Sequence, residues 1–248
     1  MSLIETECVV LKTYNLADAD KIVVLLTHDH GVVRGVAKGI KRLNSRFGSG
    51  LEPFSIAHVT YFQKETSELS SIQKVDIVKS YFTAASDPEF LQKFSYLADL
   101  VITFSPPHDP NEKLYRMTKA CIETAAADPK GLLAIGVYFE LWLLRLSGFL
   151  PDWGSCDQCR RVFDETETVG LLSNFHLICT KCSSHSRSLD KAHREIYSNA
   201  RRLSPVEFAK FAVNYGESLA ELSHILKRII SFSTSREVGG EVSLKVAH

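Results

Sequence analysis

The chain has 248 residues, of which 45% are apolar and 23% are charged. This composition is typical of a folded globular protein and argues against wholesale disorder, and the length is comfortable for two or three small domains. The 29 basic residues equal the 29 acidic ones, so the formal net charge is zero. A polyanion would therefore have to be met by a local cluster of positive charge, because the overall field offers no attraction.

The longest apolar run, 131–144, contains Glu140 and is followed by Arg145. It is too short and too interrupted to span a bilayer. The first residues lack the basic start and the long apolar core of a signal peptide. We therefore expect a cytoplasmic protein with no membrane partner. In that reducing compartment the six cysteines are expected to be metal ligands or buried thiols rather than disulfides.

The first 80 residues predict a small β-barrel. Short runs rich in β-branched residues are separated by polar or glycine-bearing turns. The predicted strands are 7–12, 21–27, 31–37, 54–62 and 69–78. Five short strands in about 75 residues favour a closed or nearly closed barrel. A β-sandwich is the alternative, but five strands are few for that architecture.

The remainder of the chain is predicted to be mostly helical, which makes the fold class α+β. Apolar residues recur with helical spacing, and proline, glycine or capping residues mark the ends. The predicted helices are 88–104, 111–127, 132–146, 189–199, 204–215 and 218–232. The helix 132–146 is apolar nearly all round and is expected to be the central buried one.

These elements suggest five regions along the chain. We expect a barrel domain, a first helical part, an irregular insert that holds four of the cysteines, a second helical part and a flexible tail. Their boundaries are 1–80, 81–150, 151–188, 189–236 and 237–248.

The strongest chemical signal is a pair of CxxC motifs. Cys156 and Cys159 form the first, and Cys179 and Cys182 form the second after nineteen intervening residues. Each tight turn can aim two thiolates at one ion, and two such turns complete a tetrahedron with no open position. The spacing predicts a structural zinc ion without catalytic chemistry.

Other interpretations of these cysteines stay open. Two disulfides suit the cytosol poorly, a four-cysteine iron site uses the same ligands, and a redox CxxC needs a strand-to-helix context that is missing. His176 and His185 lie close in the sequence, but two complete CxxC pairs need no substitute. Cys8 and Cys121 stand alone in apolar segments and are expected to be core thiols.

The second signal is a segregation of charge between residues 30 and 51, which contain five basic residues and no acidic one. The candidate DNA-binding residues are Arg34, Lys38, Lys41, Arg42 and Arg46. Basic side chains on a small barrel can follow the phosphates of a single strand. The alternative is an ordinary solvated edge, because runs of charge are usually solvated.

Aromatic residues accompany this basic segment. Phe47, Phe54, Tyr61 and Phe62 could stack on bases, or they could equally form the barrel core.

Catalytic signals are weak. The sequence has no P-loop, GxGxxG, HExxH or GxSxG motif. His28, Asp29 and His30 lie where a hairpin turn is expected, so a polar turn is favoured over a metal site. We expect a solvated loop at Asp164, Glu165 and Glu167. We therefore expect no enzyme. A nuclease of unrecognised type and a zinc-stabilised adaptor that binds only proteins remain as alternatives.

The order of barrel, helices, cysteine insert and helices resembles the bacterial RecO family of recombination mediators. The similar motifs are Val10–Tyr14, Asp20–Lys21, Leu26–Thr27, Gly31, Ala37–Arg42, Ser45–Arg46, Leu51–Phe54, Glu140–Asp152 and the two CxxC pairs. They cover the chain from about residue 7 to residue 230. Ile40 departs from the pattern, since a basic or small residue is common there.

The resemblance implies an OB-fold barrel, a helical domain and a zinc insert. It implies a non-catalytic protein of the nucleoid that binds single- and double-stranded DNA and anneals complementary strands. The implied partners are RecR, often RecF, and the acidic C-terminal tail of single-strand-binding protein, which the helical domain would take. The recombinase RecA would be helped indirectly, by loading onto coated strands.

Overall fold

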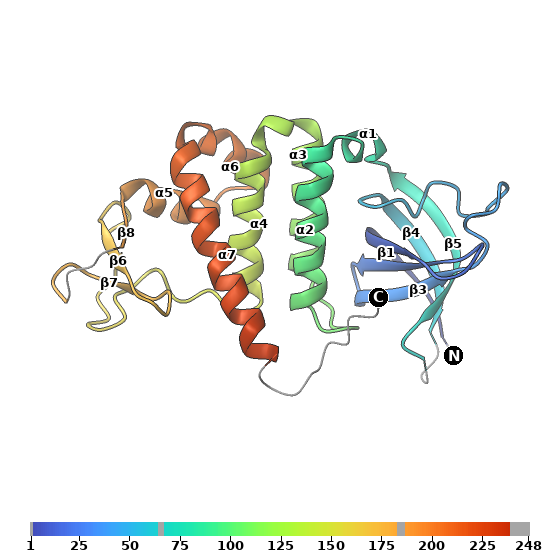
Figure 1. Cartoon of the computed structure of the whole chain (residues 1–248), viewed down its shortest axis with the longest axis horizontal. Helices are drawn as coiled ribbons and strands as arrows, with labels where there is room; N and C mark the ends of the chain where they lie inside the picture. Colours follow the sequence, from blue (N-terminus) through green and yellow to red (C-terminus); the bar gives the residue numbers. More distant parts are fainter. Residues whose placement is uncertain (1, 64–66, 183–186, 239–248) are drawn as a thin grey trace. The chain divides into compact units, whose positions relative to one another are not determined.

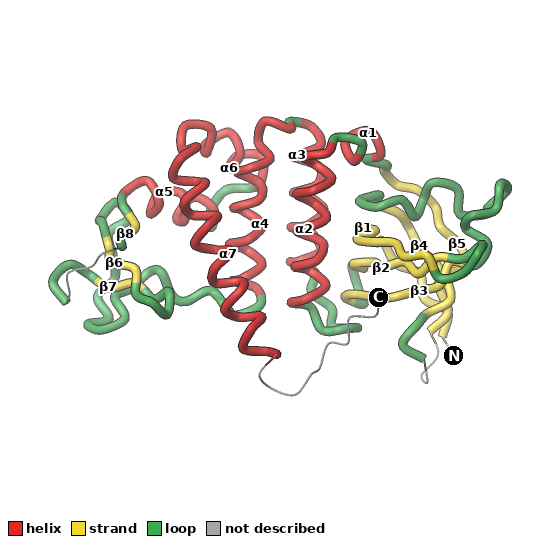
Figure 2. The backbone as a smooth tube through the Cα atoms, in the orientation of Figure 1, coloured by secondary structure: helices red, strands yellow, loops and turns green. Residues whose placement is uncertain are grey.

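The computed structural model describes residues 2–63, 67–182 and 187–238 (Figure 1). The chain forms two compact units, residues 1–132 and 133–248. Figure 2 shows strands mainly in the first unit, with a few short ones in the second. No helix within the described ranges is both long enough and apolar enough to cross a membrane.

Five strands close into a barrel in the first unit. They are β1 (Ser2–Asn15), β2 (Lys21–Thr27), β3 (Gly31–Ala37), β4 (Ile56–Gln63) and β5 (Ser70–Lys79). Their order is β1-β2-β3-β5-β4, with β4 returning to β1, and every pairing is antiparallel except β3 with β5. This five-stranded, OB-like barrel confirms the predicted architecture, and the β-sandwich alternative was wrong.

The barrel core consists of side chains that point inward from all five strands. It includes Cys8, Val10, Leu25, Val59 and Ile72, with Ile40 packed against it from the loop that follows β3. Ile40 is therefore an apolar anchor for that loop.

Gly31 lies at the start of β3, where the chain needs a glycine. Its φ of +64° is in the left-handed region, and a Cβ there would lie 2.2 Å from the carbonyl oxygen of Asp109. A larger residue would combine backbone strain with a steric clash.

Helices pack on β1 in the same unit. α1 (Phe82–Ala85) was not predicted, whereas α2 (Pro88–Phe104) and α3 (Glu112–Ala127) match the predicted helices closely. Lys12 of β1 pairs with Asp99 of α2. Glu7 of β1 accepts hydrogen bonds from the Tyr115 hydroxyl and, at 2.7 Å, from Lys119 Nζ, both on α3. The 3₁₀ turn Pro129–Gly131 follows.

The second unit is built around α4 (Leu132–Leu146), which is largely buried as predicted. The later helical elements are α5 (Lys191–Ala200), α6 (Pro205–Ala212), the 3₁₀ turn Val213–Tyr215 and α7 (Gly216–Val238). Trp142 of α4 donates to the carbonyl oxygen of Ala200 at 2.8 Å, and the buried Glu140 accepts from Ser223 of α7. These bonds tie α4 to both ends of the later helical region.

The cysteine insert is more regular than predicted. Three short strands, β6 (Val169–Leu171), β7 (Leu177–Ile178) and β8 (Ser188–Leu189), form an antiparallel sheet in the order β7-β6-β8. Strands of two or three residues are too short to show an alternation of polar and apolar residues in the sequence.

The flexible tail predicted for residues 237–248 starts too early, because residues 237 and 238 belong to α7. Residues 239–248 lie outside the described residues.

Candidate metal centre and nucleic-acid interface

The fold brings the four cysteines of the two CxxC motifs together. The sulfur atoms of Cys156, Cys159, Cys179 and Cys182 all lie within 4.8 Å of one another. In the part of the chain that the structure describes, this is the one cluster of at least three metal-ligating side chains. The cluster could hold a metal ion.

Local backbone bonds shape the first of the two CxxC turns. The Cys156 amide donates to Arg161 O at 2.8 Å, and the Arg160 amide donates back to Cys156 O at 2.9 Å. Arg160 has a φ of +60°, which lets the chain reverse tightly after the second cysteine. The second turn closes when the Cys182 amide donates to Cys179 O at 3.0 Å.

The surroundings of Cys156 favour a thiolate. Burial opposes its ionisation, but the backbone N–H groups of Cys159, Cys179 and Gln158 point at the sulfur and lower its pKa to about 6. The Cys182 thiol behaves in the opposite way, because its hydrogen bond to Cys179 and its burial raise its pKa to about 12. Four thiolates cannot all form side by side unless a cation compensates their charge.

The geometry fits a tetrahedral ion. With metal–sulfur bonds of about 2.3 Å, the sulfur atoms of a tetrahedron lie about 3.8 Å apart. The Cys159 and Cys179 sulfur atoms are 3.9 Å apart, and none of the six cysteines is joined in a disulfide in this structure. His176 lies 3.1 Å from an Asp157 oxygen instead of joining the cluster. His185 lies outside the described residues.

The two lone cysteines are core thiols, as predicted. Cys8 and Cys121 are completely buried, and burial raises the pKa of Cys8 to about 12. Burial raises the pKa of Cys121 as well. Neither thiol belongs to the candidate metal site.

The five candidate DNA-binding residues are all exposed on the barrel unit. Arg34 lies on β3, and the others lie on the segment 38–46, which we call the basic loop. Gly39 N donates to the Asp20 carboxylate at 2.8 Å, and Lys41 N donates to Ala19 O at 3.1 Å. These bonds give the basic loop a defined path beside the turn between β1 and β2.

Two of the five side chains are held by the barrel. Lys41 Nζ donates to Ala17 O at 2.9 Å, and Arg46 donates to Ile72 O at 3.3 Å. The Arg46 guanidinium also lies over the Phe47 ring. Among the described residues, Arg34, Lys38 and Arg42 have no ion pair, which leaves their charges open to a ligand.

The aromatic residues named from the sequence are mainly core. Phe47, Phe54 and Tyr61 are at most 2% exposed, so they cannot stack on a base. Phe54 packs against Phe90 and Phe94 of α2.

Sequence reasoning missed two exposed apolar side chains near the basic loop. Tyr14 on β1 is 49% exposed, and strand register aligns it with Ile22 and Val36, next to the start of the basic loop. Leu43 is fully exposed at the tip of the turn that Ser45 N closes on Arg42 O. The pattern of β1 does not separate Tyr14 from core residues, because its alternation is imperfect, and Leu43 lies in a turn, where strand alternation does not apply.

The weak catalytic candidates are polar turns and ion pairs. His28, Asp29 and His30 form the turn between β2 and β3, with His28 Nδ1 2.6 Å from Asp29. In the loop predicted to be solvated, Glu165 pairs with Arg202 and Glu167 pairs with Arg161.

Comparison with known proteins gives two adjoining family matches. Residues 1–81 match the model "Recombination protein O N terminal", and residues 86–239 match "Recombination protein O C terminal".

Relatives with assigned names agree with these matches. A protein of Koribacter versatilis named "DNA repair protein RecO" is 32% identical over 161 residues, which is 65% of each chain. A protein of the same name from Desulforamulus reducens is 24% identical over 240 residues, 96% of this chain and 92% of the relative. Another, from Pelobacter propionicus, is 27% identical over 90% of this chain and 88% of the relative.

Proposed function

The chain belongs to the RecO family of DNA repair and recombination proteins, and on that premise we propose that it is a non-catalytic recombination mediator that binds single- and double-stranded DNA and anneals complementary strands. The observation that carries the proposal is a closed five-stranded barrel with five exposed cations and no acidic residue between positions 30 and 51.

The barrel would bind the DNA backbone through Arg34, Lys38, Lys41, Arg42 and Arg46. Each phosphate contact releases counterions, so the affinity should fall steeply with salt. Tyr14, half exposed beside the basic loop, supplies a ring on which one base can stack. Base edges stay free in this arrangement, and screening of two strands lowers their mutual repulsion, which favours annealing.

The four-cysteine cluster would hold a structural Zn²⁺ ion. All four positions of a tetrahedron are filled by protein sulfur, so the ion has no open position for substrate. Its role would be to fix the insert, whose buried Trp153 donates to Phe175 O at 2.9 Å. An iron ion with the same ligands is distinguished by its visible absorption.

Family membership supports the further partners. These are RecR, with RecF in some settings, and the acidic C-terminal tail of single-strand-binding protein. RecA would benefit indirectly, when the protein helps it load onto strands coated by single-strand-binding protein. Binding to chromosomal DNA would place the protein at the nucleoid of the cytoplasm.

The test reverses charge on the basic loop. Fluorescence anisotropy with single- and double-stranded oligonucleotides at two salt concentrations should show salt-sensitive binding, and complementary strands should anneal faster with the protein. The variant Lys41→Glu with Arg42→Glu should lose most of both activities, whereas Lys113→Glu on α3 should keep them. Absence of DNA binding even in dilute salt would favour the adaptor that binds only proteins.

A further inference from the structure

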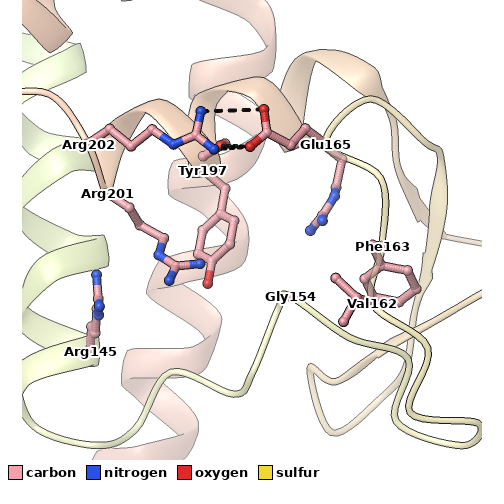
Figure 3. A pocket seen from close by; sticks show the side chains of 10 residues that line it. Arg145, Gly154, Val162, Phe163, Glu165, Tyr197, Arg201 and Arg202 are labelled. Atoms are coloured by element: carbon pink, nitrogen blue, oxygen red, sulfur yellow. Dashed lines mark hydrogen bonds and ion pairs between the residues drawn. The ribbon is translucent and has the colours of Figure 1, made fainter.

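The second unit contains a cavity of about 320 Å³ lined by four arginines. Arg145 comes from α4, Arg194 from α5, and Arg201 and Arg202 from the turn that follows α5. The opposite wall is formed by the cysteine insert, and Figure 3 shows Glu165 of that wall directed at Arg202. We call this cavity the arginine pocket.

Positive charge in the arginine pocket is only partly compensated. Glu165 is the one acidic residue of its lining, and it pairs with Arg202 and accepts from Ser198 at 3.2 Å. Arg145 and Arg201 form no ion pair with any residue that the structure describes. Hydrogen bonds from Ser155 and Gly154 lower the pKa of Asp152, and the charge of Arg201 adds to that effect. The pocket therefore offers an anion two guanidinium groups that lie over aromatic rings, Trp142 and Tyr197, but have no ion pair.

The buried Arg194 adds a positive charge in the wall of the arginine pocket. Its side chain is only 5% exposed, and one terminal nitrogen donates to Trp153 O. Its Nε is buried and has no hydrogen-bond acceptor among the described residues. Burial lowers the pKa of this guanidinium, which reflects the cost of holding its charge away from water. An anion in the pocket would not reach the buried Nε, but its negative charge would lower the electrostatic cost of the buried guanidinium.

An aromatic ring lies among these cations. The guanidinium carbons of Arg201 and Arg194 lie 5.5 Å and 5.9 Å from the centre of the Tyr197 ring. Figure 3 shows the Tyr197 ring beside Arg201 in the pocket. The Tyr197 ring is only 8% exposed, so it holds these guanidinium groups in place rather than offering a face to a ligand.

We propose that the arginine pocket binds the terminal phosphate of a DNA strand, together with its end nucleotide. This inference rests on the proposed DNA-binding function, and it adds a second site on the other unit. The cavity is at the small end of the range for ligand sites, so it suits one nucleotide rather than a passing strand.

A phosphate monoester fits this set of donors better than a carboxylate. It carries a charge of about −1.5 to −2 and three acceptor oxygens on one group, whereas a single carboxylate carries one charge and two oxygens. An arginine guanidinium can donate two parallel hydrogen bonds to two oxygens of one phosphate. A phosphodiester inside a strand also has only one charge, so the end of a strand should be preferred over its middle.

The test compares matched 12-mer single strands that carry a 5′-phosphate, a 3′-phosphate or no phosphate, by anisotropy on the full-length protein. A terminal phosphate should tighten binding about tenfold, which corresponds to about 1.4 kcal/mol. Arg201→Ala and Arg145→Ala, both at exposed positions, should abolish that preference. Arg187→Ala, an exposed arginine of the same unit outside the pocket, should keep it.

Glu165→Gln gives a result that damage to the fold would not produce. Removal of the one carboxylate in the lining should increase the preference for the phosphorylated strand, because the incoming dianion then meets less repulsion. Adenosine monophosphate should compete with the phosphorylated strand in the wild-type protein and should fail to do so in Arg201→Ala.

The two proposals fail in different ways. Lys38→Ala with Arg42→Ala should weaken all the 12-mers while the ratio between phosphorylated and unphosphorylated strands persists. Equal affinity for all the strands, or equal weakening of all of them by Arg201→Ala, would overturn the terminal-phosphate site and leave the barrel proposal intact. Binding of an unphosphorylated acidic peptide that Arg201→Ala abolishes, without competition by the nucleotide, would also overturn it.

Discussion

Replacing the three unpaired cations of the barrel by alanine should flatten the salt dependence of DNA binding by a calculable amount. Arg34, Lys38 and Arg42 are exposed and have no ion pair among the described residues. Each phosphate neutralised on a single strand contributes about 0.7 to the slope of log affinity against log salt. If all three contact phosphates, the slope should fall by about 2.

This change is large enough to measure directly. When the salt is raised from 50 to 200 mM, the affinity of the wild-type protein should fall about 20-fold more than that of the triple variant, because their slopes differ by about 2. Anisotropy titrations of a labelled oligothymidine at four salt concentrations give both slopes. Arg34→Ala, Lys38→Ala and Arg42→Ala alone should each account for about one third of the effect.

The control is Lys113→Ala, which removes an exposed lysine from α3 in the same unit. It should leave the slope unchanged, since Lys113 lies outside the basic loop. A triple variant whose slope falls by less than about 0.7, or a control that changes the slope equally, would show that these cations do not follow the phosphates.

Three further predictions concern the metal, the barrel turn and the acid stability. Chelation should loosen the insert and expose the buried Trp153, which would shift tryptophan emission to the red in a Trp142→Phe background while DNA binding by the barrel persists; an unshifted spectrum after proven metal loss would contradict this. Gly31→Ala should destabilise the protein by about 2 kcal/mol or more in urea unfolding, because it adds left-handed strain to a clash with Asp109, and Gly48→Ala is the control, since it shares a positive φ but has open space. The pKa of Glu7 is lowered below 4.5, because hydrogen bonds from Lys119 and Tyr115 outweigh the opposing effect of burial. The Glu7 carboxylate therefore stabilises the fold at neutral pH, and this stabilisation is lost as the pH falls through the lowered pKa. Glu7→Gln should reduce the free energy of unfolding in urea by about 1–2 kcal/mol at pH 7 and by less at pH 3. An equal reduction at both pH values would refute this prediction.

The features that the sequence predicted well depend on local pattern. Two CxxC turns each constrain their own geometry, so spacing alone predicted that four sulfurs would meet. The limits of α2 and α4 were readable for the same reason, because a proline start, a glycine end and apolar spacing act within a few residues.

The features that the sequence did not reveal depend on contacts between distant residues. Arg145, Arg194 and Arg201 are spread over 57 positions, and only packing of α4 against the end of α5 brings them to one cavity. Phe47 and Tyr61 could not be assigned to stacking or core until closure of the barrel showed that they face inward. Burial of a ring depends on the whole sheet, whereas a cysteine turn depends on four residues.

One wall of the arginine pocket belongs to the same insert that the cysteine cluster gathers, through Gly154, Val162 and Glu165. Oxidation of those thiols, or a shortage of the proposed Zn²⁺ ion, would therefore deform the arginine pocket and leave the barrel intact. On the two proposals above, such a protein would still bind DNA through the barrel but lose its preference for strand ends, so the supply of a trace metal would decide whether strand ends are recognised.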